Sequence, residues 1–422
     1  MKKKTLLMFF TVSLCAFLCG CDRKAPELSV ESEVIEQDCG SSLNLEDYLN
    51  ENLKITDETD DGIVDYKLAD LTHTIKVDKE IYNSETGEID TNTPGEYTID
   101  VSVSDESKNQ SSLSIKLKLD PLKLENTVEE TVSMDCGEKF DILDYFNSNV
   151  RITNQSEDVQ YKIEDFDYSI ECDDSIYDGK SSELDTTKFG EFPIKLKLNS
   201  KSFDNDSVSF TLKLNPMVVD KGYYVYKDEY SEDIEFLGFC EYKNASSENL
   251  TVKSIEFRYY DKDGVLISSS DMPDYSLSYV ASGSSGYALD TYASFNAKIT
   301  SEDEIDHMDV EVDYDKPIEE DTTSLEVGEM EIVNNYEYNV SGFGGSTIIT
   351  NPYDKGVEYY SLLAGMYDDS GKLIGVMESM DCDSIKAGEK ARATVSWLPD
   401  SRKIPDMVKS IKGSARVTSF VE

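Results

Sequence analysis

Histidine and tryptophan are scarce in this 422-residue chain, which has two histidines and one tryptophan. Neither His73 nor His307 stands in a metal-binding motif, and the chain has no G-x-S-x-G elbow and no phosphate-binding loop. With 86 acidic residues, pairs of carboxylates occur by chance and do not identify a glycosidase. We therefore interpret both histidines as surface residues rather than ligands. We expect no enzymatic activity, no catalytic residue, no metal site and no cofactor.

Basic residues are also few, since 40 lysines and arginines face 86 acids and the net charge is −46. Such a surface repels phosphate backbones and anionic lipid headgroups, which argues against nucleic acid and against peripheral membrane binding. High charge often accompanies disorder, but 39% hydrophobic and 10% aromatic residues favour folded domains. We expect the acids to lie on the solvated face of strands.

Long apolar runs are absent except at the start, where Lys2 to Lys4 precede the stretch Thr5 to Leu18. This stretch is too short to span a membrane and has the layout of an export signal. Leu18-Cys19-Gly20-Cys21 resembles the lipobox of bacterial lipoproteins. The resemblance implies cleavage between Gly20 and Cys21 and a diacylglyceryl thioether on Cys21, with further acylation such as palmitate; a plain secretory signal is the alternative. The protein would then be held by lipid on the extracytoplasmic face of the cell membrane.

The number of cysteines does not suit a framework of disulfide bonds. After Cys21, five cysteines remain, which is an odd number and fits poorly with a disulfide scaffold. We predict buried thiols, with a Cys136–Cys172 bridge as the alternative. The five are Cys39, Cys136, Cys172, Cys240 and Cys382.

Internal repeats are the strongest signal in the body of the chain. Asp38-Cys39-Gly40 recurs 97 residues later as Asp135-Cys136-Gly137, and Gly95-Glu96-Tyr97 recurs 95 residues later as Gly190-Glu191-Phe192. Each copy ends in two segments in which apolar and polar residues alternate, which predicts strands with one buried face. The first copy has Tyr97, Ile99, Val101, Val103 and then Leu113, Ile115, Leu117, Leu119; the second has Phe192, Ile194, Leu196, Leu198 and then Val208, Phe210, Leu212, Leu214.

Residues 94–109 (PGEYTIDVSVSDESKN) resemble the end of bacterial Ig-like, cadherin-like surface domains. The shared pattern is a Pro-Gly turn, an aromatic residue, an alternating strand, and an Asp turn before Asn. The resemblance implies a β-sandwich that serves as a stalk or adhesive module without catalytic residues.

A different repeat occupies the C-terminal half. Phe257-Arg258-Tyr259-Tyr260-Asp261 is followed by a turn at Gly264, and 107 residues later Ala364-Gly365-Met366-Tyr367-Asp368 is followed by a turn at Gly371. Asn244 and Asn351 share this spacing, and Gly283 and Gly388 fit a second shared hairpin. The segments resemble the extracytoplasmic β-sandwich family named for its F-x-L-Y-D motif.

Two features allow a binding interpretation. Asp57 to Gly62 matches the first half of a calcium loop, but Leu68 occupies the position of the bidentate acid, so we interpret the segment as a turn. We interpret the hairpin that begins at Asp261 in the same way. The tyrosines at 223, 224, 226, 259 and 260 are expected in cores, with a sugar- or partner-binding surface as the alternative.

The predicted fold class is all-β, with tandem β-sandwich (Ig-like) domains after a lipoprotein signal peptide. We expect a signal peptide at 1–20, a lipidated linker at 21–26, Ig-like sandwiches at 27–120 and 121–216, and sandwiches resembling the F-x-L-Y-D family at 217–316 and 317–422, with Pro26, Pro121, Pro216 and Pro317 at the boundaries. The predicted function is a lipid-anchored, non-enzymatic cell-surface protein in which the Ig-like pair is a spacer and the C-terminal pair contacts an unknown protein or glycan ligand or an envelope component. The alternatives are an accessory subunit of an envelope assembly and, third, an enzyme with an unrecognised acidic site.

Overall fold

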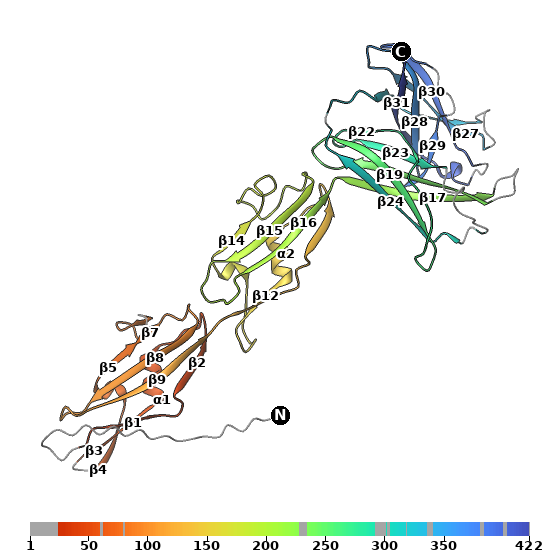
Figure 1. The fold of residues 1–422 in the computed structure, drawn as a ribbon. Coiled ribbons are helices and arrows are strands. Elements are labelled where there is room, and N and C mark those ends of the chain that lie inside the picture. Colours follow the sequence, from red (N-terminus) through yellow and green to blue (C-terminus); the bar gives the residue numbers. More distant parts are fainter. Residues whose placement is uncertain are drawn as a thin grey trace. The chain divides into compact units, whose positions relative to one another are not determined.

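The computed structural model describes residues 24–421, apart from 60–61, 79–80, 228–233, 292–300, 302–303, 318, 336–340, 380–383 and 400–402. The described chain consists mainly of strands in successive sheets (Figure 1), which confirms the all-β class and the tandem β-sandwich prediction. Gly20, Cys21 and Cys382 lie outside the described residues. Within the part described, no helix has the length and apolar character needed to span a membrane.

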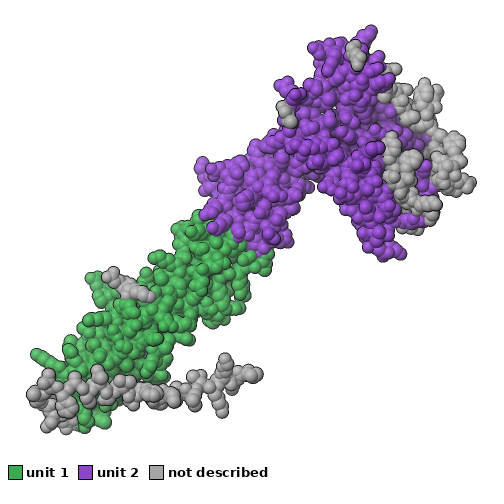
Figure 2. Space-filling model, in the orientation of Figure 1, with its two compact units in different colours: residues 1–127, 149–169, 196–208 green, residues 128–148, 170–195, 209–422 purple. Residues whose placement is uncertain are grey.

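The chain divides into two compact units, which are described separately (Figure 2). Unit 1 comprises residues 1–127, 149–169 and 196–208, and unit 2 comprises residues 128–148, 170–195 and 209–422.

The first repeat lies in unit 1. Its main sheet has the order β2-β9-β8-β5, a second sheet has the order β1-β3-β4, and β6 pairs with β7. Strand β2 runs parallel to β9, which the sequence analysis did not predict. The elements are β1 (Glu27–Val30), β2 (Val34–Asp38), α1 (Leu45–Asn52), β3 (Leu53–Thr59), β4 (Gly62–Tyr66), η1 (Leu68–Asp70), β5 (Thr72–Val77), β6 (Tyr82–Asn83), β7 (Glu88–Ile89), β8 (Gly95–Ser104) and β9 (Gln110–Asp120).

Alternation places the predicted residues in the core. Ile99, Val101 and Val103 of β8 are fully buried, and β9 buries Ile115, Leu117 and Leu119 against them. This confirms the two predicted strands, because a period of two puts alternate side chains on one face of a sheet.

A short helix in each repeat was missed by the sequence analysis. In α1, Leu45 and Leu49 are one turn apart and both fully buried. Asn44 caps this helix by accepting a hydrogen bond from the Asp47 N–H at 3.1 Å. Asp141 does the same for the second helix, α2 (Ile142–Asn149), where it accepts from the Asp144 N–H at 2.9 Å.

In the described residues, the second repeat has the same order of elements except that it lacks a counterpart of the β6–β7 pair. Its sheets are β10-β12-β13 and β11-β16-β15-β14, and β11 runs parallel to β16 as β2 does to β9. The predicted strand residues Phe192 to Leu198 and Val208 to Leu214 are buried at alternate positions. The elements are β10 (Lys123–Asn126), β11 (Thr131–Asp135), β12 (Val150–Thr153), β13 (Gln160–Tyr161), η3 (Ile163–Asp165), β14 (Tyr168–Glu171), β15 (Gly190–Leu198) and β16 (Ser207–Asn215).

Residues 217–421 of unit 2, here called the head, form the remaining sheets. Their orders are β17-β18-β23-β21, then β20-β19-β22 with β24 also paired to β19, and finally β25-β31-β28-β29-β30-β27-β26. In the last sheet β25 also pairs with β27, so the sheet closes on itself. The elements are β17 (Met217–Lys227), β18 (Ile234–Asn244), β19 (Leu250–Tyr260), β20 (Leu266–Ser270), β21 (Asp274–Tyr275), β22 (Tyr279–Val280), β23 (Ser285–Asp290), β24 (His307–Asp315), β25 (Ser324–Val327), β26 (Glu331–Asn334), β27 (Phe343–Thr350), β28 (Val357–Tyr367), β29 (Leu373–Glu378), β30 (Lys390–Ser396), η5 (Pro405–Met407) and β31 (Ser410–Phe420).

One hydrophobic core joins the two halves of the head. It combines Leu237, Phe239, Tyr287 and Leu289 from the first half with a larger set from the second half that includes Trp397. A second core, around Tyr242 and Phe257, belongs to the first half. The last two sandwiches therefore pack directly on one another.

Candidate functional site: the C-terminal head

Matching hairpins in the two halves of the head carry the repeated Tyr-Asp motif. Asp261 Oδ1 accepts hydrogen bonds from the N–H groups of Asp263 and Val265, both at 2.9 Å. Asp368 Oδ1 accepts from Ser370 and Lys372 at 2.9 and 3.0 Å. The carboxylates thus stabilise turns, as predicted, rather than standing free for a cation.

A buried asparagine organises the loop after β18 and the loop after β27. Asn244 and Asn351 are both fully buried, and each donates through Nδ2 to the carbonyl oxygen four residues later, at 2.7 and 2.8 Å. Each also accepts from the N–H two residues later, at 3.0 Å. The 107-residue spacing found in the sequence therefore marks one structural feature used twice.

The two predicted glycine turns are also present. Gly283 has φ +77° and Gly388 has φ +67°, a left-handed conformation that favours glycine. They precede β23 and β30, as the proposed shared hairpin requires.

Gly365 lies where the second half of the head meets the first. A Cβ atom at this position would lie 2.5 Å from Cε1 of Tyr287, so no larger residue fits without displacement. The equivalent residue of the first half is Arg258, whose guanidinium pairs with Glu256 at 2.7 Å and Glu311 at 3.1 Å. The residue at this motif position is thus small where the strand is covered and charged where the strand faces water.

Tyrosine hydroxyl groups form hydrogen bonds where the two halves of the head meet. Tyr367 donates to Glu241 Oε2 at 2.8 Å and lies 2.8 Å from the Tyr287 hydroxyl. Burial raises the pKa of both tyrosines, and their mutual contact and the Glu241 carboxylate add to this for Tyr367. These groups stay protonated and act as structural hydrogen bonds.

Further polar contacts cross the same junction. Ser276 Oγ and Ser414 Oγ are 2.5 Å apart and buried. Arg416 donates from Nε to the Tyr275 carbonyl at 2.8 Å, and its guanidinium lies 4.0 Å from the centre of the Tyr275 ring.

Glu378, at the end of β29, is a partly buried acid of the head whose pKa is shifted. Burial raises the pKa of its carboxyl to about 7, and the charge of Asp274 adds to the effect. A carboxyl that titrates near neutrality is what an acid–base role requires, so Glu378 is the residue on which the enzyme alternative depends.

The two histidines considered in the sequence analysis contact neighbouring groups of the fold. His73 Nδ1 lies 3.0 Å from the Leu71 carbonyl oxygen, and His307 pairs with Asp306 at 3.0 Å while stacking on Tyr260. In the described chain, no group of three or more His, Cys, Asp or Glu side chains could hold a metal ion.

The tyrosines in the head mostly support cores. Tyr259 is fully buried and donates to Asp290 Oδ2 at 2.7 Å. Tyr223 packs against the core of the first half, and Tyr224 and Tyr226 pack against the shared core. Among the tyrosines that the structure describes in the head, Tyr359 of β28 is an exposed exception, with 52% of its surface accessible.

The segment that resembled a calcium loop lies in the β3–β4 hairpin. Thr59 pairs with Gly62 and Glu58 with Ile63, which agrees with the turn interpretation. Asp60 and Asp61 lie outside the described residues.

The cysteines that the structure describes are free thiols, namely Cys39, Cys136, Cys172 and Cys240. Cys136 donates instead to the Lys188 carbonyl at 3.3 Å, so the alternative Cys136–Cys172 bridge is not formed. Burial raises the pKa of Cys39 and of Cys136 to about 11, which makes both poor nucleophiles.

A hollow of about 320 Å³ lies at the end of the last sandwich, at the low end of the size of ligand pockets. Its lining is mainly small or apolar: Gly356, Val357, Ser384, Ile385, Lys386, Ala387 and Val421. Beside it, Lys355 Nζ lies 3.6 Å from the centre of the Phe420 ring. This hollow can bind a group of atoms but presents no nucleophile–base pair.

Comparisons with known proteins give no family. No family model matches the chain, and no curated protein matches it. Domains 4–9 of the surface layer protein SbsC align over 94% of this chain and 68% of that one, with 12% identity and a TM-score of 0.28. A tetra-tandem repeat from the extending region of a large adhesion protein aligns over 87% and 100%, with 11% identity and a TM-score of 0.18. The protein SGBP-B of a mixed-linkage glucan utilization locus of Bacteroides ovatus aligns over 93% and 98%, with 10% identity and a TM-score of 0.15. Similarities at this level carry no functional argument.

Proposed function

We propose that the protein is a lipid-anchored, non-enzymatic cell-surface protein. Its two Ig-like repeats act as a spacer, and its head contacts a protein or glycan ligand or an envelope component. The observation that carries this proposal is the set of polar contacts in the head, where hydroxyl and carboxylate groups that a site could use form hydrogen bonds between the two sandwiches instead. Such a head is a preformed surface, which lowers the entropic cost of binding a partner.

The anchor rests on Cys21. It precedes the first described residue, Lys24, by three positions, and Lys24 Nζ pairs with Glu58 at 3.2 Å. Three residues span at most about 11 Å. A lipid on Cys21 would therefore hold the first repeat next to the membrane surface, with the head at the other end of the chain.

The contact site is best sought around the hollow and Tyr359. An exposed tyrosine offers a large area with few rotatable bonds, which suits both protein and glycan ligands. The acidic surface makes an anionic polymer a poor ligand.

Affinity capture from the native envelope tests this proposal. The full chain serves as bait, with Tyr359→Ala and Val421→Asp as site variants and Met407→Ala as a matched control, since Met407 is a large exposed side chain that does not line the hollow. We expect the two site variants to lose the captured ligand and the control to keep it. Equal capture by all four proteins would place the contact elsewhere.

The same capture addresses the accessory-subunit alternative, which predicts one stable protein partner in fixed proportion. The enzyme alternative is tested with a glycosidase, peptidase and esterase panel. Turnover that Glu378→Gln abolishes would overturn the non-enzymatic proposal.

A further inference from the structure

A corner of three residues recurs near the end of each Ig-like repeat. In the first repeat, Asp90 Oδ1 accepts hydrogen bonds from the backbone and side-chain nitrogens of Asn92, at 3.1 and 2.8 Å. In the second, Asp185 Oδ1 accepts from the backbone nitrogen and the hydroxyl of Thr187, at 3.0 and 2.7 Å. The two corners are 95 residues apart, as are the other late landmarks of the repeat.

The central threonine ties each corner to the repeated Asp-Cys-Gly turn. Thr91 donates to the Ser41 carbonyl at 2.6 Å, and Thr186 donates to the Glu138 carbonyl at 2.6 Å. Their own carbonyls accept from Gly40 and Gly137, at 3.2 and 3.0 Å. Each corner is therefore fixed on the body of its repeat.

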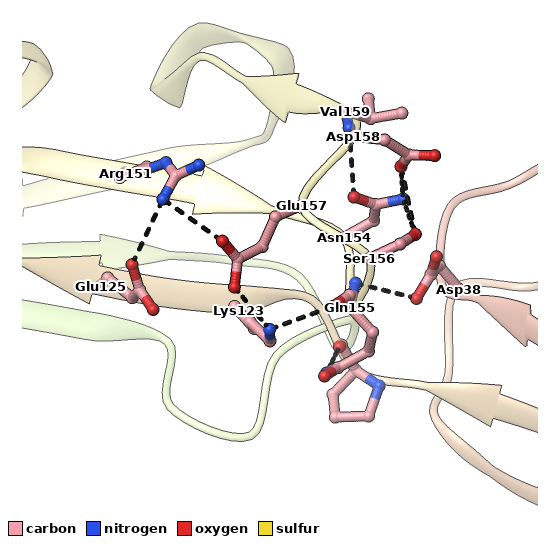
Figure 3. A network of polar contacts seen from close by, with 11 residues as sticks. Asp38, Lys123, Glu125, Arg151, Asn154, Gln155, Ser156, Glu157, Asp158 and Val159 are labelled. Carbon is pink, nitrogen blue, oxygen red and sulfur yellow. Dashed lines mark hydrogen bonds and ion pairs between the residues drawn. The ribbon is translucent and has the colours of Figure 1, made fainter. Parts of the chain in front are cut away.

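In unit 1, the outward carbonyl of the first corner receives a bond from the following domain. Ser202 is 2% exposed, and its hydroxyl donates to the Asn92 carbonyl at 3.0 Å. The boundary residue Pro121 also accepts, from Gln155 Nε2 at 2.6 Å. The Gln155 N–H donates to Asp38 at 3.0 Å (Figure 3).

In unit 2, the equivalent two carbonyls are used again. The Thr187 carbonyl accepts from the Ser247 N–H at 2.8 Å, and the Pro216 carbonyl accepts from the Ala245 N–H at 2.8 Å. Beside them the Phe189 ring packs on Tyr314 with centres 5.9 Å apart. The donors differ in type, but the acceptors occupy the same positions of the repeat.

The residue after each boundary proline is buried in the following domain. Leu122 is 4% exposed, and its N–H donates to the Ser202 carbonyl at 2.8 Å. Met217, 95 residues later, is 8% exposed and belongs to the core of the head. The connections are thus single residues with packing on both sides, not free linkers.

One donor loop at each joint is organised by a buried asparagine. At the first joint this is the loop that carries Gln155, while Ser202 lies in the separate loop between β15 and β16. Asn154 accepts from the Val159 N–H at 3.1 Å and donates to Ser156 and Asp158 (Figure 3). Asn244 performs the corresponding task in the head. A loop that is already ordered loses little entropy when it docks.

We propose that these contacts are one docking scheme used twice. The corner carbonyl and the boundary-proline carbonyl of each Ig-like repeat accept hydrogen bonds from loops of the next domain, namely the loops 154–159 and 199–206 at the first joint and the loop 245–249 at the second. These bonds hold the next domain in one orientation, without a metal ion or a disulfide. This inference rests on the proposed spacer function and deepens it, since a spacer with fixed joints holds each domain in a set orientation relative to the one before it. Because the acceptors are backbone carbonyls, the joints should be insensitive to chelators and to pH near neutrality.

Distances between spin labels on the two sides of the first joint test the scheme. The protein used comprises residues 24–422. An azide-bearing amino acid replaces the exposed residues Thr98 and Asn126 and carries the labels, so the native cysteines remain unchanged. The variants are Gln155→Ala, Ser202→Ala and both together. The matched control is Glu157→Ala. Glu157 lies on the same loop as Gln155, but its ion pairs are to Lys123 and Arg151 of the second repeat (Figure 3) and not to the first repeat.

We expect a narrow distance distribution in the unmodified chain and in the control, unchanged by a chelator. The distribution should broaden in each single variant and most in the double variant, while circular dichroism stays the same. A distribution already broad in the unmodified chain, or one that the double variant leaves unchanged, would overturn the scheme. The measurement uses the isolated chain, so failure of lipid anchoring or ligand capture would not affect it.

Discussion

Tyr287 and Tyr367, from the two halves of the head, place their hydroxyl oxygens 2.8 Å apart in a buried position. Tyr367 donates onward to Glu241, so Tyr287 is the donor to Tyr367. Each hydroxyl is satisfied only because both halves are present.

Tyr367→Phe should destabilise the head, because it removes this hydroxyl and leaves the Tyr287 hydroxyl without its acceptor. The expected loss in the free energy of unfolding is about 1–3 kcal/mol. Urea unfolding followed by near-ultraviolet circular dichroism measures it. Tyr359→Phe is the matched control and should leave the midpoint unchanged, because Tyr359 is 52% exposed. Equal midpoints for both variants would contradict the role of the network.

Gly365→Ala should also weaken the head, because the new methyl group would lie 2.5 Å from the Tyr287 ring. Overpacking of this kind costs about 1–3 kcal/mol. Arg258→Ala at the equivalent position of the first half should cost no more than about 1 kcal/mol, since the ion pairs to Glu256 and Glu311 that it removes face water. The same unfolding assay compares them, and the reverse order of the two losses would be inconsistent with the observed packing.

Glu378 gives the head a pH dependence. Its pKa is raised to about 7 in the folded chain, whereas an unfolded glutamate titrates near 4.5. Between these values the unfolded state loses its proton first, so stability should fall as pH rises from about 4.5 to 7, by up to about 3 kcal/mol. Asp274, whose charge adds to the effect, and Arg416, whose charge acts on Asp274, are the neighbouring charges that enter these shifts.

Glu378→Gln should remove that part of the pH dependence and make the chain more stable than the unmodified protein at pH 8. Urea midpoints at pH 5, 6, 7 and 8 provide the comparison. Glu326→Gln, at an exposed position of β25, is the control and should follow the unmodified protein. A constant difference between Glu378→Gln and the unmodified chain at all four pH values would count against a raised pKa.

Reductant should not change thermal stability, because the described cysteines are free thiols. Melts of residues 24–422 with and without dithiothreitol should coincide. At pH 8 a thiol reagent should modify Cys39 and Cys136 slowly, since their pKa is about 11 and few molecules carry the thiolate. A lower melting temperature under reductant would indicate an oxidised pair.

Cys21→Ala should abolish lipid attachment and release the protein from the membrane fraction. The physical reason is that the proposed thioether would form on this sulfur, and outside residues 5–18 the sequence has no long apolar stretch that could replace it. Incorporation of radiolabelled fatty acid together with fractionation provides the measurement, with Cys19→Ala as control. Equal labelling of Cys21→Ala and unmodified protein would exclude Cys21 as the anchor.

Part of the interaction scheme could have been found in the sequence. Asp90-Thr91 and Asp185-Thr186 repeat at the spacing of the other landmarks, yet the sequence analysis did not use them. The short helices were missed for a different reason. Leu45 and Leu49 suit a helix, but eight residues of helix have little stability alone and form because the core covers them.

The sequence by itself determined the all-β class, the two repeats and the strands that alternate, because the period of two is a property of each strand alone. It also determined the hairpins at Asp261 and Asp368, where a side chain bonds to its own turn. Only the tertiary structure decided that Gly365 is covered and Arg258 is not, since the same motif position meets another sandwich in one copy and water in the other. The shared core, the Tyr287–Tyr367 contact and the carbonyl joints connect residues that lie between 29 and more than 100 positions apart in the sequence. No local pattern encodes such pairs, because they depend on which faces the folded domains bring together.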